Sequence, residues 1–476
     1  MIDCYKKVLF FLFFFCSIMP FLKAQQPFSS SFVEYGASAF VGDHTPLWQA
    51  SNQHGLSSVK NNTYIRGGFF YNKELKHSWS YRTGVDMALA AGFTSTTVVQ
   101  QAFLDINYNM FGISIGSKEL DSPLLNRQLS SGGLTWSGNA RPIPQVRVGI
   151  PDYVRLSDYI RFKAEMSYGW FTDNNYQKKR VGAGKWYTKD IKYHHKSFFL
   201  RIQKPQSHWV FDFSVSLDTQ FGGYKVGGID EGDLGNSLKD YWNVLIPRGG
   251  NNSGPEGEKY YQGNYLGSEH FRVTYKTKEF SIACYLENFY DDFSGMGKLN
   301  GMDGLWGIEY NSGTPQLIDG IALEYYQTTN QSGPLHGVDN SVVKRTGGAD
   351  DYYNNDWYPG WVHWGMAMAN PLITSPIYSN DGDMTLKYNR VKAIHLGWQG
   401  TIIPSLTYRA KISYNQTWGT PFKPTIEILE NYSIFVECNY RPQELPEWNF
   451  CASLAFDMGE IYGDNLGLLL KVRKNF

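Results

Sequence analysis

The sequence predicts an all-β fold: a transmembrane antiparallel β-barrel of about eighteen strands, with short periplasmic turns and long extracellular loops. Three observations predict it: an export signal at the amino terminus, polar and apolar residues that alternate along the chain, and connections that are alternately short and long. The composition fits this class, because 33 Tyr, 30 Phe, 14 Trp and 48 Gly accompany only 42% hydrophobic residues. A large soluble protein could share these totals, so the arrangement of the residues carries the prediction.

The first residues have the pattern of a secretory signal peptide. Two lysines precede an apolar run from Val8 to Phe15, and the chain turns polar after Ala24. This run is shorter than the roughly 20 apolar residues that a membrane-spanning helix needs. We therefore expect export with cleavage near Ala24, which divides the chain into a signal peptide at 1–24 and a β-barrel at 25–476.

Strict alternation of residue types predicts strands with one lipid-facing row and one lumen-facing row. In WVFDFSVSLD (209–218), Phe211 and its alternate neighbours are apolar, whereas the alternate residues from Asp212 to Asp218 are Asp or Ser. In LTYRAKISYN (406–415), apolar or aromatic residues alternate with polar or charged ones in the same way. A barrel in a membrane needs this period of two along each strand. A soluble sandwich rarely places so many charges on its second face without a helix to cover it.

Such segments predict eighteen strands, an even number as a closed bacterial barrel requires. The chain ends in a strand that closes on Phe476, and a terminal aromatic residue is common in outer-membrane barrels. The expected strands lie near 30–41, 63–71, 79–90, 97–107, 111–116, 142–150, 159–171, 195–202, 207–220, 267–276, 279–289, 303–310, 319–327, 388–398, 405–414, 431–440, 449–458 and 466–476.

The connections between these strands sort by length into two alternating sets, which supports the strand count. Short ones, such as 203–206, 399–404 and 441–448, belong on the periplasmic side. Long ones, near 42–62, 117–141, 172–194, 222–266, 328–387 and 415–430, belong outside the cell. Four tryptophans fall at the expected periplasmic strand ends, where an interfacial girdle belongs: Trp79, Trp209, Trp398 and Trp448.

Cysteines and histidines give no sign of a disulfide or a metal site. The expected mature chain keeps Cys284, Cys438 and Cys451, and the alternation places Cys438 and Cys451 on opposite faces of their hairpin. Bridged cysteines must point the same way, so we expect free thiols. His194 and His195 are adjacent in a strand and point to opposite faces, which argues against a shared metal.

Catalytic chemistry also finds little support in the sequence. Glu287, Asp291, Asp292 and Asp303 could be imagined as a glycosidase pair, but spacing in sequence does not establish their separation in space. Barrel lumens and loops are normally rich in acids. We expect no enzymatic activity, no catalytic residue, no cofactor and no metal, and we find no nucleic-acid signature.

One segment resembles a known family. SGNARPIP (137–144) is similar to the signature of the Wzi-type capsule assembly proteins of Gram-negative outer membranes. The resemblance continues through four further segments: YHHKSFFLRI (193–202), GNYLGSEHFRV (263–273), DDFSGMGKLNGMDGLWGIEY (291–310) and YYQTTNQSGPLH (325–336).

The resemblance implies an integral outer-membrane barrel of eighteen strands that acts as a lectin, binding capsular or related surface polysaccharide and supporting capsule assembly and retention. Its implied partners are that polysaccharide, outer-membrane lipids and lipopolysaccharide, and capsule export machinery. The chain departs from the best-known members in one respect. They carry a periplasmic helical bundle near the amino terminus, whereas here the strand-like run SSFVEYGASAF begins almost at once.

Within SGNARPIP we expect Asn139 and Arg141 to brace the end of a long outer loop. Their side chains would bond to backbone carbonyls or lumen carboxylates, while Pro142 and Pro144 fix the turn. An arginine at this corner would lock the loop over or into the lumen.

Two groups of loop residues are candidate sites for polysaccharide, because sugars are bound by aromatic faces and by planar polar side chains that satisfy hydroxyl groups. The first is the aromatic patch DDYYNNDWYPGWVHWG (350–365), with Asp350, Asp351, Tyr353, Trp357, Trp361 and Trp364. Its alternative role is to pack against itself and cap the pore. The two roles are compatible.

The second group lies in the loop 172–194, which has six basic residues against two acidic ones. Its candidates for binding acidic sugars or lipopolysaccharide phosphates are Lys178, Lys179, Arg180 and Trp186. The alternative is a solvated basic loop, since exposed lysines contribute little when nothing docks.

The sequence therefore predicts a non-enzymatic lectin of the outer membrane, with large outer loops that occlude the pore. The alternative is an outer-membrane channel for passive uptake of small solutes.

Overall fold

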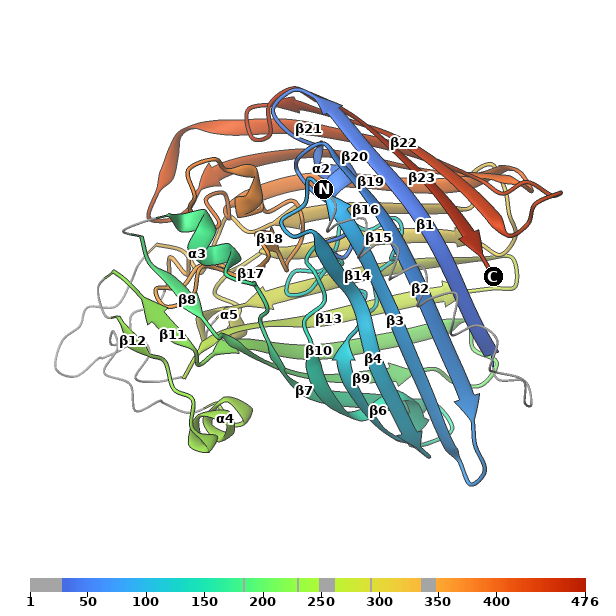
Figure 1. Ribbon diagram of the computed structural model, residues 1–476. Helices are drawn as coiled ribbons and strands as arrows, with labels where there is room; N and C mark the ends of the chain where they lie inside the picture. The colour runs from blue at the N-terminus through green and yellow to red at the C-terminus, as the bar shows by residue number, and fades with distance from the viewer. Residues whose placement is uncertain (1–27, 183–184, 229–230, 248–261, 292, 335–347) are drawn as a thin grey trace, which may run out of the picture.

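The computed structural model describes residues 28–182, 185–228, 231–247, 262–291, 293–334 and 348–476 (Figure 1). The expected signal peptide at 1–24 lies outside the described residues. No helix in the described part of the chain has the length and apolar character needed to cross a membrane.

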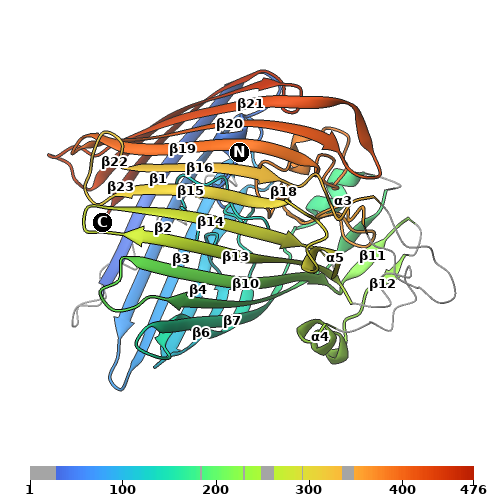
Figure 2. The same ribbon diagram turned by 180° about the vertical axis from the view of Figure 1, so that it is seen from behind.

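Eighteen antiparallel strands form one closed sheet, as predicted. The strands are β1 (Phe28–Val41), β2 (Asn62–Glu74), β3 (Trp79–Ala91), β4 (Thr97–Tyr108), β5 (Phe111–Ser117), β6 (Gln145–Arg155), β7 (Ile160–Trp170), β9 (Lys192–Ile202), β10 (Trp209–Phe221), β13 (Asn264–Lys276), β14 (Phe280–Tyr290), β15 (Gly304–Ser312), β16 (Gly320–Gln327), β19 (Val391–Ile403), β20 (Leu406–Gly419), β21 (Pro424–Tyr440), β22 (Trp448–Gly459) and β23 (Asn465–Asn475). Each of these strands pairs with its neighbour in the chain, and β1 also pairs with β23, which closes the barrel (Figures 1 and 2).

Every expected strand has a counterpart, but several boundaries were wrong, including the turn expected at 399–404, most of which belongs to β19. The loop expected at 415–430 is short, because β20 and β21 continue their pairing through Thr417 and Leu429 and leave only 420–423 between them. The strand expected at 142–150 is β6, which begins at Gln145. Pro142 and Pro144 precede it, since proline has no N–H to donate to a neighbouring strand.

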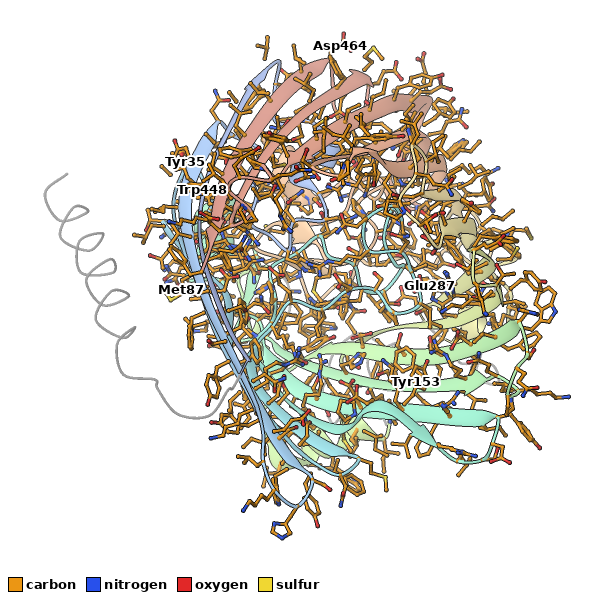
Figure 3. The ribbon with its side chains drawn as sticks, turned by 90° about the vertical axis from the view of Figure 1, so that its right-hand side faces the viewer. Tyr35, Met87, Tyr153, Glu287, Trp448 and Asp464 are labelled. Carbon is orange, nitrogen blue, oxygen red and sulfur yellow. The ribbon has the colours of Figure 1, made fainter. Side chains whose placement is uncertain are left out.

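The two rows of each strand face lipid and lumen as predicted. In β10 the Phe211 side chain is 48% exposed on the outer wall, whereas Asp212 is 6% exposed and faces the lumen. Figure 3 looks along the barrel from the end with the short turns. Tyr35 and Met87 lie on the outside of the wall, and Tyr153 and Glu287 lie within it. Apolar side chains on the outer wall are therefore exposed to lipid, not to water.

The main hydrophobic core lies inside the barrel. Its buried residues come largely from three extracellular connections, including Trp48, Leu134 and Trp361, and pack against small or aromatic side chains of the wall. The three connections are 42–61, with the short helix α2 (Leu47–Ala50), 118–144, and the described part of 328–390, with β17 (Val362–His363), β18 (Met366–Ala367) and the 3-10 turn η2 (Pro376–Tyr378). We call them plug loops 1, 2 and 3, and together the plug.

A charge on the outer wall tests the assignment of the lipid face. Leu454 lies near the middle of β22 and is exposed on the outer wall. We expect Leu454→Arg to lower the free energy of unfolding by about 2–4 kcal/mol, as arginine does near the bilayer midplane. Urea titration of the barrel folded in lipid vesicles measures this change. Leu454→Met is the matched control, and equal stability of the two variants would refute the assignment.

Candidate functional site

The three plug loops meet at the segment Ser137–Asn139 of plug loop 2. The Ser137 backbone N–H donates to the Met368 carbonyl of plug loop 3 at 2.8 Å. The Asn139 side-chain amide donates to the Ala367 carbonyl at 2.9 Å, and its Oδ1 accepts from the Asn52 N–H of plug loop 1 at 3.3 Å. Asn139 is fully buried. The prediction that Asn139 braces this loop through backbone groups is confirmed, and the loops that it joins lie inside the lumen.

Arg141 is a second brace, but its partners are not the expected carbonyls or carboxylates. Its guanidinium donates to the hydroxyl groups of Thr94 and Ser95, both at 2.9 Å, and lies over the Trp364 ring, 4.3 Å from its centroid. Burial lowers the pKa of Arg141 to about 10. Gly55 packs against it, with φ +71°, and a Cβ at that position would overlap the Arg141 side chain. The arginine therefore joins all three plug loops to the tip of the β3–β4 hairpin.

The two prolines that follow fix the end of plug loop 2 against the barrel wall. The Pro142 carbonyl accepts from the Ser117 hydroxyl of β5 at 3.2 Å. The Pro144 carbonyl accepts from the Trp170 N–H of β7 at 3.1 Å. The turn predicted for these prolines thus leads from the plug into β6.

Glu324 of β16 holds plug loop 2 to the wall. One carboxylate oxygen accepts from the Ser130 hydroxyl and the Tyr285 hydroxyl, each at 2.6 Å. The other accepts from the Ser131 N–H at 2.8 Å and from its hydroxyl at 2.5 Å. A buried carboxylate needs such donors to replace water.

Two further lumen carboxylates serve the plug in the same way. Glu287 of β14 accepts from the Leu134 N–H at 3.0 Å, and Asp457 of β22 accepts from the Leu47 N–H at 2.9 Å. Lys411 of β20 complements them by donating to the Ser130 carbonyl at 3.2 Å. Sequence reasoning missed Glu324, Lys411 and Asp457 as plug anchors. Their only signal in sequence is a charged residue in the lumen-facing row.

Two of the carboxylates weighed as a glycosidase pair, Glu287 and Asp303, bind backbone groups, and Asp292 lies outside the described residues. Glu287 anchors plug loop 2, and Asp303 accepts from the backbone N–H groups of Asn330 and Gln331. Within the described residues, no cluster of three or more His, Cys, Asp or Glu is arranged to hold a metal. Cys284, Cys438 and Cys451 are free thiols.

The aromatic patch of plug loop 3 is not an exposed platform for sugars. Tyr353 and Trp361 are 0% exposed and Trp357 is buried. The Tyr353 hydroxyl donates to the Leu134 carbonyl and the Trp361 indole N–H to the Thr135 carbonyl, both at 2.9 Å. These three rings therefore present little exposed surface to a polysaccharide. Tyr353 and Trp361 pack in the core inside the barrel, whereas Trp357 packs in a separate cluster with Ile191, Leu234 and Tyr358.

The remaining candidates of this patch also serve the plug. Trp364 is half-buried beneath Arg141. The Asp350 carboxylate accepts from the Ser332 hydroxyl at 2.5 Å, and that of Asp351 accepts from the Asn389 amide at 2.7 Å. Both aspartates are half-buried and join parts of plug loop 3.

The basic candidates lie at the extracellular end of the barrel, on a surface that we call the basic face. It comprises α3 (Tyr176–Val181) and a small sheet of β8 (Tyr187–Lys189), β11 (Tyr224–Val226) and β12 (Gly232–Asp233) (Figure 1). Lys178 and Lys179 are exposed, and their ammonium groups make no hydrogen bond or ion pair with other described residues.

Two other basic groups fix this face to the plug. Arg180 donates to the carbonyls of Pro376 and Ser379 in plug loop 3. Lys225 lies between the rings of Trp186 and Trp357, 4.9 and 4.8 Å from their centroids. Trp186 is half-buried, so part of its surface remains available at the extracellular end. Among the basic candidates predicted in the loop 172–194, Lys178 and Lys179 are therefore exposed, whereas Arg180 bonds to plug loop 3.

On the periplasmic side of the plug lies a cavity of about 490 Å³, which we call the vestibule. Charged side chains line it in ion pairs that cross between strands. Arg66 pairs with Asp86 at 2.5 Å, Arg473 with Glu34 at 2.6 Å, and Arg409 with Glu437 at 2.9 Å. Because each of these cations has a carboxylate partner, the vestibule is polar without a strong excess of either charge.

Comparison with known proteins identifies the fold. No protein-family model and no curated protein matches the sequence. Among solved structures, this chain is similar to Wzi of Escherichia coli, an outer membrane protein involved in group 1 capsule assembly and described as a carbohydrate-binding β-barrel. The TM-score is 0.56 at 12% identity, over 93% of this chain and 83% of that chain. OccAB4 of Acinetobacter baumannii has 0.47 at 12% identity over 95% and 99%, and OccD3 of Pseudomonas aeruginosa 0.47 at 9% over 95% and 92%. At 12% identity the likeness to Wzi shows a closed outer-membrane barrel with a Wzi-like fold, and by fold an outer-membrane location.

Removing the Asn139 side chain should loosen the plug. Asn139→Ala deletes bonds from plug loop 2 to the other two loops, each worth about 1 kcal/mol. We expect the open plug to become about tenfold or more populated, seen as longer current steps in planar bilayers. Asn449→Ala is the control, because the Asn449 side chain, on the lumen row of β22, makes no hydrogen bond with the described residues. Identical currents from the two variants would show that Asn139 does not hold the plug.

Acid should loosen the plug through His363. Its Nδ1 lies 2.9 Å from the Arg141 carbonyl, and its Nε2 lies 2.8 Å from the Thr172 carbonyl and 3.2 Å from the Thr172 backbone nitrogen. Burial lowers the pKa of His363 to about 4, below its usual 6.5. An open plug binds the proton more readily, so closure is fully stabilised above pH 6.5 and weakens as the pH falls toward 4, by about 3 kcal/mol in total.

The measurement is the open probability in planar bilayers from pH 7.5 to 4.5 in wild type and in His363→Gln, which has no proton to gain. We expect a larger rise on acidification in wild type. Parallel curves would mean that other groups control the acid response.

Proposed function

We propose that this protein is a non-enzymatic outer-membrane lectin that binds capsular or related surface polysaccharide at its extracellular end and supports capsule assembly and retention. The observation that carries the proposal is the plug. Three loops fill the lumen and are bonded to the wall through Glu287, Glu324 and Asp457. A lumen closed in this way leaves the extracellular surface as the place where a polymer outside the cell can bind.

The chemistry of the basic face supports an acidic polysaccharide as the ligand. Lys178 and Lys179 project from α3 with no carboxylate partner in the described residues, so they are available to sugar carboxylates or phosphates. On the same face the Tyr224 ring is partly exposed and has the Lys189 ammonium 5.2 Å from its centroid. Aromatic faces beside cations suit sugars that carry negative charge. The described character of Wzi as a carbohydrate-binding barrel is consistent with this proposal through the shared fold.

The partners included in the proposal are the surface polysaccharide, outer-membrane lipids and lipopolysaccharide, and the capsule export machinery. Deletion of the gene, followed by separate assays of cell-bound and released capsule, tests the proposed role. Loss of the bound fraction alone supports retention. An unchanged bound fraction would contradict it.

A diffusion channel for small solutes is the second candidate, and the vestibule favours it. A cavity of about 490 Å³ with ion-paired walls could admit polar solutes from the periplasmic side up to the plug. Planar bilayers separate the two functions. The lectin proposal expects little or no steady conductance from the wild-type protein, and large open-porin steps would favour the channel.

Reversing two exposed charges tests the ligand chemistry. We expect Lys178→Glu with Lys179→Glu to weaken binding of purified acidic capsular polysaccharide about tenfold, since each surface ion pair contributes up to about 1 kcal/mol. The affinity of wild type should also fall as salt is raised. Biolayer interferometry on the detergent-solubilised barrel measures both effects. The matched control reverses Lys204 and Lys278, exposed lysines in periplasmic turns. An equal loss in the control would point to net charge instead of the basic face.

A further inference from the structure

The helix α4 (Leu238–Leu245) lies outside the barrel wall, although it belongs to an extracellular connection (Figures 1 and 2). Two side chains from the outer rows of the wall hold it there. The Tyr168 hydroxyl of β7 donates to the Tyr241 carbonyl, and the Lys196 ammonium of β9 donates to the Leu245 carbonyl, each at 2.8 Å. A cation at the carboxyl end of a helix also satisfies its unpaired carbonyls.

The same contacts give the direction of α4 along the wall. Asn236, just before the helix, bonds to Lys192 at the extracellular end of β9, whereas the last turn of α4 bonds to Lys196 further down that strand. The helix therefore descends beside β9 toward the periplasm.

The end of α4 reaches the depth of the lipid bilayer. From Lys196 to Ile202, the last residue of β9, a tilted strand rises about 15 Å. The apolar band of an outer-membrane barrel is about 25 Å tall, so the level of Lys196 lies within it. The wall agrees with this estimate: Met166, which pairs with Lys196, and Phe198, the next outward residue of β9, are both exposed on the outer wall.

The side of α4 that faces away from the wall is apolar. Leu238 and Trp242 of the helix, four residues apart, and Ile246, which directly follows its last residue, are 88%, 54% and 41% exposed. Residues spaced by four lie on one face of a helix. Val244, in contrast, is fully buried. We call the three exposed residues the α4 stripe. In water this stripe would be an exposed apolar patch, which is unfavourable. Beside the lipid-facing wall, the stripe instead extends the apolar surface that lipid covers.

The polar end of the helix suits the head-group region. The Ser237 N–H donates to the Asp240 carboxylate at 2.7 Å in a capping box, which supplies an acceptor at the upper end of the helix. Lys239 is exposed beside it. Tryptophan favours the boundary between lipid and water, where Trp242 would lie.

We propose that α4 is immersed in the outer leaflet, with the α4 stripe against lipid acyl chains, and that it anchors the loop carrying β11 and β12 to the membrane surface. The inference does not depend on the lectin proposal, because only the lipid face of the barrel enters it. A consequence is that the basic face is positioned partly by the bilayer.

Site-specific photocrosslinking tests this placement. Trp242→p-benzoylphenylalanine is introduced into the full barrel, which is folded into vesicles of phosphatidylethanolamine and phosphatidylglycerol and illuminated. Mass spectrometry then identifies the adducts. Phe198→p-benzoylphenylalanine on the lipid-facing wall is the positive control. Tyr224→p-benzoylphenylalanine on the basic face is the matched extracellular control. Heat-modifiable migration on gels confirms that each variant is folded.

We expect phospholipid adducts at position 242 in an amount comparable to that at 198 and several-fold above that at 224. Adducts mainly with a second copy of the barrel would show that the α4 stripe is a protein interface and would overturn the proposal. A yield at 242 no higher than at 224, with normal yield at 198, would show that the helix stays in water and would overturn it too.

Discussion

A backbone that crosses lipid finds no water to bond with, so each strand needs a partner on both sides. The pairing of β1 with β23 meets this requirement by removing both edges of the sheet. Closure forces one row of every strand outward and the other inward, which creates a polar lumen inside an apolar wall. The plug fills part of this polar lumen, the vestibule is the part below the plug, and the basic face lies at its extracellular end.

The plug meets the same requirement inside the barrel. Loops that enter the lumen remove backbone N–H groups from bulk water. Where no neighbouring strand offers a carbonyl, carboxylates of the wall accept hydrogen bonds from these N–H groups. The Glu324 carboxylate accepts hydrogen bonds from Ser130 and Ser131, and the Asp457 carboxylate accepts one from the Leu47 N–H. Because these acids are already bonded to the plug, they act as structural groups.

The extracellular connections divide among three environments. Plug loops 1, 2 and 3 turn into the lumen and bury their aromatic rings there. The connections between β7 and β9 and between β10 and β13 stay outside and form the basic face, with exposed Lys178 and Lys179. One helix of the second connection, α4, turns to the outer wall. The composition of each segment matches its surroundings: aromatic in the plug, cationic toward solvent, and apolar along the α4 stripe.

The sequence by itself determined the eighteen strands and their two faces, and it predicted Asn139 as a loop brace. The strands and their faces depend on a local pattern, since a strand repeats every two residues, whereas the partners of Asn139, Asn52 and Ala367, lie far away along the chain. Only the tertiary structure decided that Trp361 and Tyr353 are buried, that Arg141 lies over Trp364, and that Glu324 anchors the plug. Each of these depends on contacts between residues that are far apart in the chain. An aromatic loop has the same sequence whether it covers the pore or enters it, and the packing inside the closed barrel selects between the two.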